Sequence, residues 1–128
     1  HNVKPKMIPS TAKGKKAFTK FKRIAESPKG WALWEASVDF FRPHQIRAHA
    51  AVHEIPVMGD VLYGGAEAPT QRELHPKKQR AGLNFPSFHG LALHLAEVQL
   101  VPGDPDATIL CESPKHLRLL IRRMGLGE

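Results

Sequence analysis

The clearest pattern in the chain is an alternation of apolar and polar positions over residues 31–40. Even-numbered positions from Ala32 to Phe40 are all apolar, whereas Glu35 and Ser37 lie on the opposite face. Because side chains alternate across an extended strand, this pattern predicts a β-strand with one buried face. Just upstream, residues 15–24 mix β-forming residues with lysine and arginine, which predicts a second strand with a basic face.

A helix is predicted directly after the strand at 31–40. Pro43 suits the first turn of a helix, and no helix breaker follows before Pro56. Residues 43–54 therefore predict a helix of about three turns.

A second helix is predicted near the end of the chain. Ser113 is the expected N-cap, Pro114 suits the first helical position, and Gly125 can terminate the helix. Between these ends, apolar residues recur at the spacing of one helical face: Leu117, Leu120, Ile121 and Met124.

The middle of the chain is less regular. Residues 55–90 are rich in glycine and proline, with a short helix expected near 71–81. Residues 91–101 and 107–112 read as two strands joined by a turn, so they should pair as a hairpin. Strands and helices without strict alternation predict an α+β fold with a mainly antiparallel mixed sheet and flanking helices.

Charge divides the 128 residues unevenly. The net charge is +7, and residues 1–30 contain nine lysines and arginines against Glu26 alone. This arrangement favours backbone-directed nucleic-acid binding, although a solvated chain terminus has the same composition. We expect residues 1–14 to be a flexible basic segment and residues 15–128 to form one folded unit.

Other bulk features restrict the environment. The chain starts at His1 and is expected to be a fragment or a trimmed product. Cys111 is the single cysteine, so no disulfide can form within the chain; we expect a buried thiol and a cytoplasmic protein. No apolar stretch is long enough to cross a membrane, which predicts a soluble protein.

The segment 41–54 concentrates residues that can carry chemistry: Arg42, His44, Gln45, Arg47, His49 and His53. His49 and His53 have the spacing of two metal ligands on a helix, but Ala50 stands where a metalloprotease needs glutamate. A second interpretation is nucleic-acid contact by the arginines and His44. A third is purely structural, with Ile46 and Ala50 facing the core.

The continuation of this segment resembles a known family. Residues 41–65, F-R-P-H-Q-I-R-A-H-A-A-V-H-E-I-P-V-M-G-D-V-L-Y-G-G, resemble the RluA-like pseudouridine synthase motif G-R-T-H-Q-I-R-V-H-L-A-x-x-G-H-P-I-L-G-D-x-L-Y-G. The strand at 14–21, the strand at 91–100 and the helix at 113–124 also match the family. Phe41 and Pro43 depart from its usual glycine and threonine.

The resemblance implies roles for individual residues. Arg47 would pair with a catalytic carboxylate, and Leu93 would form an apolar wall of the cleft. Gly59, Asp60 and Tyr63 would shape a turn. RNA contacts are expected from Arg42, His44, Gln45, Lys15, Lys16, Lys20 and Lys22.

The resemblance also implies what the protein does. The parent protein would be an isomerase that converts uridine to pseudouridine in structured rRNA or tRNA, without cofactor or metal. The family's H-R-L-D-x-x-T-S-G segment, which bears the nucleophilic aspartate, is absent from this sequence. The chain would then be the C-terminal half of the catalytic domain, inactive alone and able to dimerise through uncovered surface. A non-catalytic RNA-binding module is the alternative.

Overall fold

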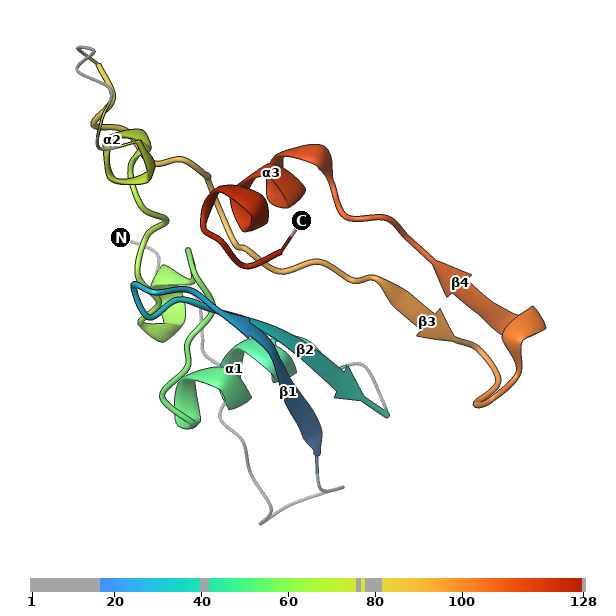
Figure 1. Ribbon diagram of the computed structural model, residues 1–128. Helices are drawn as coiled ribbons and strands as arrows, with labels where there is room; N and C mark the ends of the chain where they lie inside the picture. The colour runs from blue at the N-terminus through green and yellow to red at the C-terminus, as the bar shows by residue number, and fades with distance from the viewer. Residues whose placement is uncertain (1–16, 40–41, 76, 78–81, 128) are drawn as a thin grey trace.

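The protein is α+β, as the sequence predicts (Figure 1). The computed structural model describes residues 17–39, 42–75, 77 and 82–127. Its elements, in order, are β1 (Thr19–Glu26), β2 (Ala32–Val38), α1 (Gln45–Val52), the 3₁₀ turn η1 (Val61–Tyr63), α2 (Gln71–Leu74), β3 (Glu97–Gln99), the 3₁₀ turn η2 (Pro105–Ala107), β4 (Thr108–Leu110) and α3 (Lys115–Arg123).

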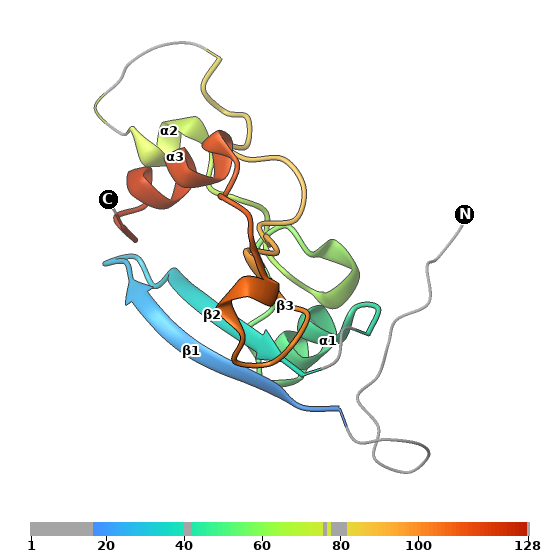
Figure 2. The same cartoon turned by 90° about the vertical axis from the view of Figure 1, so that its right-hand side faces the viewer.

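The strands form two separate antiparallel pairs within the described residues, β1 with β2 and β3 with β4. Helix α1 lies against the β1–β2 hairpin, whereas α2 and α3 lie at the other end of the molecule (Figures 1 and 2). The β3–β4 hairpin projects away from both groups. The antiparallel pairing predicted for residues 91–112 is confirmed, but β3 and β4 pair only with each other among the described strands.

The β1–β2 hairpin is the longer of the two. Thr19 pairs with Val38, and the register shifts between Arg23 and Ala25, so Ile24 forms a bulge. The Phe21 ring meets the Trp34 ring edge-on at 6.4 Å between centroids. Both strands were predicted from their alternation; Phe40 and residues 15–16 lie outside the described residues.

Several predicted boundaries are wrong by a few residues, for local reasons. Helix α1 begins at Gln45 and not at Pro43, because His44 has a positive φ of 59° that no α-helical residue can adopt. Pro114, not Ser113, is the N-cap of α3, and it makes no side-chain cap. Helix α2 ends at Leu74, and part of its predicted extension lies outside the described residues.

The predicted strand at 91–101 is reduced to the three residues of β3. The first half of the predicted strand instead contacts the loop after α1, where the Ala92 amide donates to the Met58 carbonyl at 2.9 Å. A β-carbon on Gly59 would lie 1.9 Å from the Gly90 carbonyl oxygen, so the two backbones touch. This loop contact replaces the strand pairing and brings residues 91–93 close to α1.

The core is small and lies under α3. Phe88 and Ala68 pack with Leu120, Met124 and Leu126. Helix α3 ends in a Schellman motif at Gly125, whose φ is 75°; the Leu126 amide donates to the Ile121 carbonyl at 3.0 Å. The predicted apolar stripe and the terminating glycine are both confirmed.

Apolar side chains are also found at the surface. Along the β3–β4 hairpin, Val98, Leu100, Ile109 and Leu110 are exposed. Cys111 is exposed too, so the expectation of a buried thiol is wrong; its segment lies outside the core. Among the described residues, none of the helices is both long and apolar enough to cross a membrane.

Replacing Gly59 tests the contact that positions residues 90–93. We expect Gly59→Ala to destabilise the protein by about 3 kcal/mol, because it adds a backbone clash to an unfavourable positive φ. Gly64→Ala is the matched control: its φ is 83°, against 82° at Gly59, but its β-carbon would meet nothing within 4 Å. Its cost should be about 1 kcal/mol. Equal losses in urea unfolding of the two variants would refute the contact.

Candidate functional site

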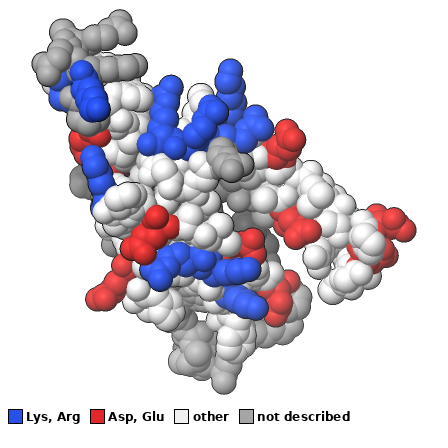
Figure 3. Space-filling view, in the orientation of Figure 1, with Lys and Arg blue, Asp and Glu red and all other residues white. Residues whose placement is uncertain are grey.

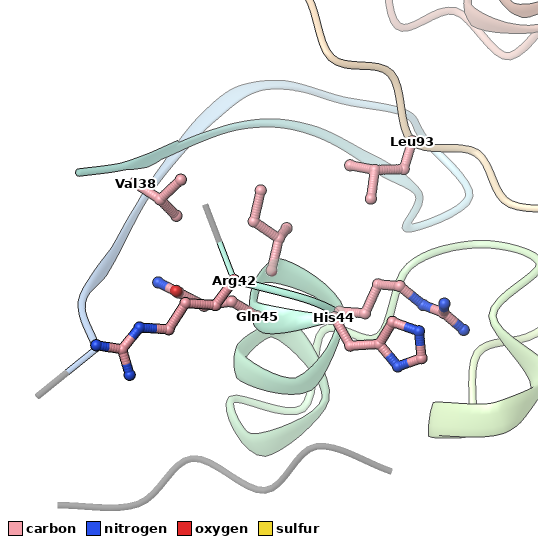
Figure 4. Close-up of a pocket in the computed structure, with 7 residues that line it drawn as sticks. Val38, Arg42, His44, Gln45 and Leu93 are labelled. Atoms are coloured by element: carbon pink, nitrogen blue, oxygen red, sulfur yellow. The ribbon is translucent and has the colours of Figure 1, made fainter. Parts of the chain in front are cut away.

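The start of α1 forms one side of a pocket of about 150 Å³. Its lining residues are Val38, Arg42, His44, Gln45, Ile46, Arg47 and Leu93. Val38 from β2 and Leu93 point toward the start of the helix and form an apolar wall (Figure 4). All lining residues except Val38 and Ile46 were proposed from the sequence as site residues, so the structure brings that group together.

A bidentate ion pair between Arg47 and Asp60 lies beside the pocket. Arg47 Nε donates to Asp60 Oδ2 at 2.9 Å, and Nη2 donates to Oδ1 at 2.7 Å. The Asp60 side chain is 0% exposed and that of Arg47 is 22% exposed. The hydrogen bonds to Asp60 raise the pKa of Arg47 above its ordinary value, against the opposing effect of burial. The guanidinium is therefore held charged and in one orientation.

The ion pair leaves part of the guanidinium available. An arginine has five N–H donors, and Asp60 takes two of them through one edge. The outer edge of Arg47 can bind a further carboxylate or a phosphate while Asp60 holds the inner one. The Tyr63 ring, centred 5.2 Å from the guanidinium carbon, supports it from a third side.

The loop that bears Asp60 is fixed by its own backbone. The Asp60 carbonyl accepts hydrogen bonds from the amides of Gly65 at 2.7 Å and Tyr63 at 3.1 Å. The Gly59 amide donates to the Ala66 carbonyl at 2.7 Å. The Asp60 carbonyl thus accepts from the amides of the turn, while the Asp60 carboxylate binds Arg47.

His44 occupies a strained position at the N-cap of α1. Its left-handed backbone costs energy for a residue with a β-carbon, and its side chain makes no cap hydrogen bond to the helix. Its Nδ1 instead lies 3.1 Å from the Tyr63 hydroxyl. Strain of this kind is concentrated at functional sites, and here it places an imidazole at the pocket.

Gln45 and His49, which lie one turn apart on α1, bind the helix to β1. Gln45 is 7% exposed, and its Nε2 donates to the Phe18 carbonyl at 2.9 Å and to the Thr19 hydroxyl at 3.0 Å. His49 Nδ1 lies 2.6 Å from the same hydroxyl. Since that hydroxyl already accepts from Gln45, it can donate its hydrogen to a neutral His49. Burial, and then the nearby His53, lower the pKa of His49.

Of the four lysines expected to contact RNA, the two that the structure describes do not line the pocket. Lys15 and Lys16 lie outside the described residues. Lys20 and Lys22 are exposed, and they alternate with Thr19, whose side chain faces α1. They therefore point away from the pocket side of the hairpin.

Metal binding by α1 has little support in the contacts. His49 Nδ1 is engaged with Thr19, and His53 is the C-cap of α1. Over the described ranges, no cluster of three or more histidine, cysteine, aspartate or glutamate side chains could hold a metal ion.

The chain is similar to a curated bacterial protein. The chain is 33% identical, over 102 residues, to the uncharacterized RNA pseudouridine synthase YhcT of Bacillus subtilis (strain 168). The aligned region covers 79% of this chain and 28% of that protein, so the chain spans about a quarter of its length. This match supports a relationship between the chain and the pseudouridine synthase family. No protein-family model matches the chain, and no solved structure matches it.

The similarity to that protein reaches well beyond the pocket residues. An alignment over 79% of the residues is longer than any single motif proposed from the sequence. The sequence did not reveal that Arg47 and Asp60, 13 residues apart, contact each other. An aspartate in a tight glycine-rich turn among apolar residues was the available indication, because a buried carboxylate needs a cation.

The two partners of the ion pair should differ in their effect on stability. Arg47→Met leaves a fully buried carboxylate without its cation, so we expect a loss of about 3–5 kcal/mol. Asp60→Asn leaves an arginine that can reach water, so the loss should be about 1–2 kcal/mol. Urea unfolding measures both. Arg23→Met, which breaks the exposed pair with Glu26, is the control and should cost under about 1 kcal/mol.

Acidification should destabilise the protein through His49. Its pKa is lower in the folded state than the ordinary 6.5, so the folded state favours the neutral ring. The stabilisation is complete above about pH 6.5 and is lost as pH falls through the folded pKa. We expect His49→Gln to weaken this pH dependence of the free energy of unfolding. His89→Gln, at an exposed position, should retain it; loss of the dependence in both variants would contradict the assignment.

Proposed function

We propose that this chain forms the arginine-bearing part of the catalytic cleft of an RluA-like RNA pseudouridine synthase. The observation that carries the proposal is the preset guanidinium of Arg47 beside an apolar pocket, in a chain similar to an RNA pseudouridine synthase. The substrate would be a uridine in structured rRNA or tRNA. The reaction detaches uracil at its ring nitrogen and re-attaches it through a ring carbon.

The role of Arg47 follows from electrostatics. A carboxylate beside a uracil that has left the base stack is desolvated and tends toward protonation, which removes its nucleophilicity. A guanidinium within contact distance favours the charged form. Asp60 aligns Arg47 for this task and leaves its outer edge able to bind that second carboxylate. Because the atoms of uridine are only rearranged, the step needs no cofactor.

Val38, Ile46 and Leu93 would receive the base. Their side chains offer an apolar surface next to the charged group, and such walls exclude water from the reacting atoms. His44 and Arg42, at the same pocket, would contact the RNA around the target nucleotide. Gln45 would hold the start of α1 in place at the pocket, since its amide donates hydrogen bonds to β1 and to Phe18 just before it.

The nucleophile itself would come from a segment outside these 128 residues. The sequence contains no H-R-L-D-x-x-T-S-G segment, and Asp60 is already committed to Arg47. The rest of such a catalytic domain, or a second copy of the chain, would cover the exposed apolar residues of the β3–β4 hairpin.

A non-catalytic RNA-binding module is the second candidate. The net charge of +7 and the exposed cations support RNA binding whether or not a nucleophile is supplied. The two candidates make different demands on Arg47: catalysis needs its planar, bidentate guanidinium, whereas binding needs only a cation.

Arg47→Lys therefore tests the catalytic proposal in the complete product of the reading frame. We expect pseudouridine formation in bulk RNA, measured by mass spectrometry of nucleosides, to fall by about a hundredfold or more. RNA affinity should change by less than about threefold, since the charge is retained. Arg23→Lys, at an exposed residue of β1, is the control and should keep full activity.

Two other outcomes would contradict the catalytic proposal. Full activity of the Arg47→Lys product would remove Arg47 from the catalytic step. A complete product that binds RNA yet forms no pseudouridine would favour the module. The 128-residue chain alone should be inactive in the same assay.

A further inference from the structure

Helix α3 carries a cationic face that the proposed cleft does not use. Four of its nine residues are basic, Lys115, Arg118, Arg122 and Arg123, and none is acidic. All four are exposed, while Leu120 and Met124 on the other side are buried. Lys115, Arg118 and Arg122 follow one another at three- and four-residue spacing, so they share one face. We call these four residues the α3 cationic face.

The charges on this face are not neutralised within the described chain. No described carboxylate forms an ion pair with any of the four. Space-filling Figure 3 shows basic side chains gathered over α3, apart from those over β1. Like charges one turn apart destabilise a helix by about 0.2–0.5 kcal/mol per pair, so the cluster works against folding.

Helix capping explains only half of the cluster. Arg122 and Arg123 lie in the last turn of α3, where cations interact favourably with the helix dipole. Lys115 is the first residue of the helix, where the dipole repels a cation, and Arg118 is only three residues later. The helix dipole therefore does not favour a positive charge at these two positions, which is consistent with an anionic partner.

The partner's chemistry follows from the rest of the helix. A membrane-surface helix inserts apolar side chains between lipids, but the apolar side of α3 is packed in the core. A row of exposed cations on the outer side of a packed helix suits the phosphates of a nucleic acid, and arginine can bind each phosphate with two hydrogen bonds.

We propose that the α3 cationic face is a second RNA-binding surface, which holds the phosphate backbone of the RNA away from the pocket. In both ribbon views α3 lies apart from α1, so the α3 cationic face and the pocket would contact different parts of a bound RNA (Figures 1 and 2). The surface would bind structure flanking the modified nucleotide without reading its sequence. The choice of RNA rests on the proposed function; the charge argument does not.

The test is RNA affinity of the full 128-residue chain at several salt concentrations. The variant is Arg118→Gln with Arg122→Gln, which keeps good helix formers at exposed positions. The matched control is Lys29→Gln with Lys77→Gln, which removes the same charge from exposed sites outside α3. A fluorescein-labelled RNA hairpin is the probe, read by anisotropy, and thermal unfolding checks that both variants fold.

We expect the α3 variant to bind about tenfold or more weakly than the control, with a slope of log affinity against log salt smaller by about 1.5–2. Charge reversal to glutamate at the same two positions should weaken binding further. Equal affinities of variant and control would overturn the proposal. So would preferential binding of the parent to phosphatidylserine vesicles over RNA, lost in the α3 variant.

These results are distinct from those that test the cleft. Arg47→Lys should leave hairpin affinity nearly unchanged, because it keeps its charge and lies away from α3. Full pseudouridine formation by the Arg47→Lys product, with intact α3-dependent binding, would sink the Arg47 assignment alone. A lack of α3-dependent binding in an active enzyme would sink only the α3 proposal.

Discussion

The burial of the Asp60 carboxylate is the constraint from which the site follows. A carboxylate with no exposed surface needs a cation with two well-placed donors, and Arg47 provides both at 2.9 and 2.7 Å. That requirement joins α1 to the loop at 57–66. The loop in turn holds residues 90–93 through the close approach of Gly59 and Gly90, which brings Leu93 to the pocket.

Side chains of helix α1 contact two different parts of the fold, strand β1 and the loop at 57–66. Gln45 and His49 bond to β1 through Thr19, so one face is committed to the hairpin. Arg47 faces the loop, and His44 at the helix start is held in a strained backbone conformation against Tyr63. The short helix can therefore present an arginine and an imidazole in fixed positions, although it has only eight residues.

The charges of the described residues serve different purposes in different places. At the pocket, the charge of Arg47 is paired and directional, which suits chemistry. On α3, cations are exposed and unpaired with any described acid, which suits long-range attraction of a polyanion. The small core under α3 and the exposed β3–β4 hairpin leave much apolar surface available to a further segment or copy.

Local patterns in the sequence were enough to predict most helices and strands and the group of site residues. Alternation predicted β1 and β2, the apolar stripe and Gly125 predicted α3, and the motif at 41–65 gathered Arg42, His44, Gln45 and Arg47, because each pattern depends on neighbouring residues. Only the tertiary structure paired Arg47 with Asp60, reduced the strand at 91–101 to three residues and started α1 at Gln45. Those outcomes depend on contacts between residues distant in sequence, or on one strained dihedral, and neither is encoded in a periodic pattern.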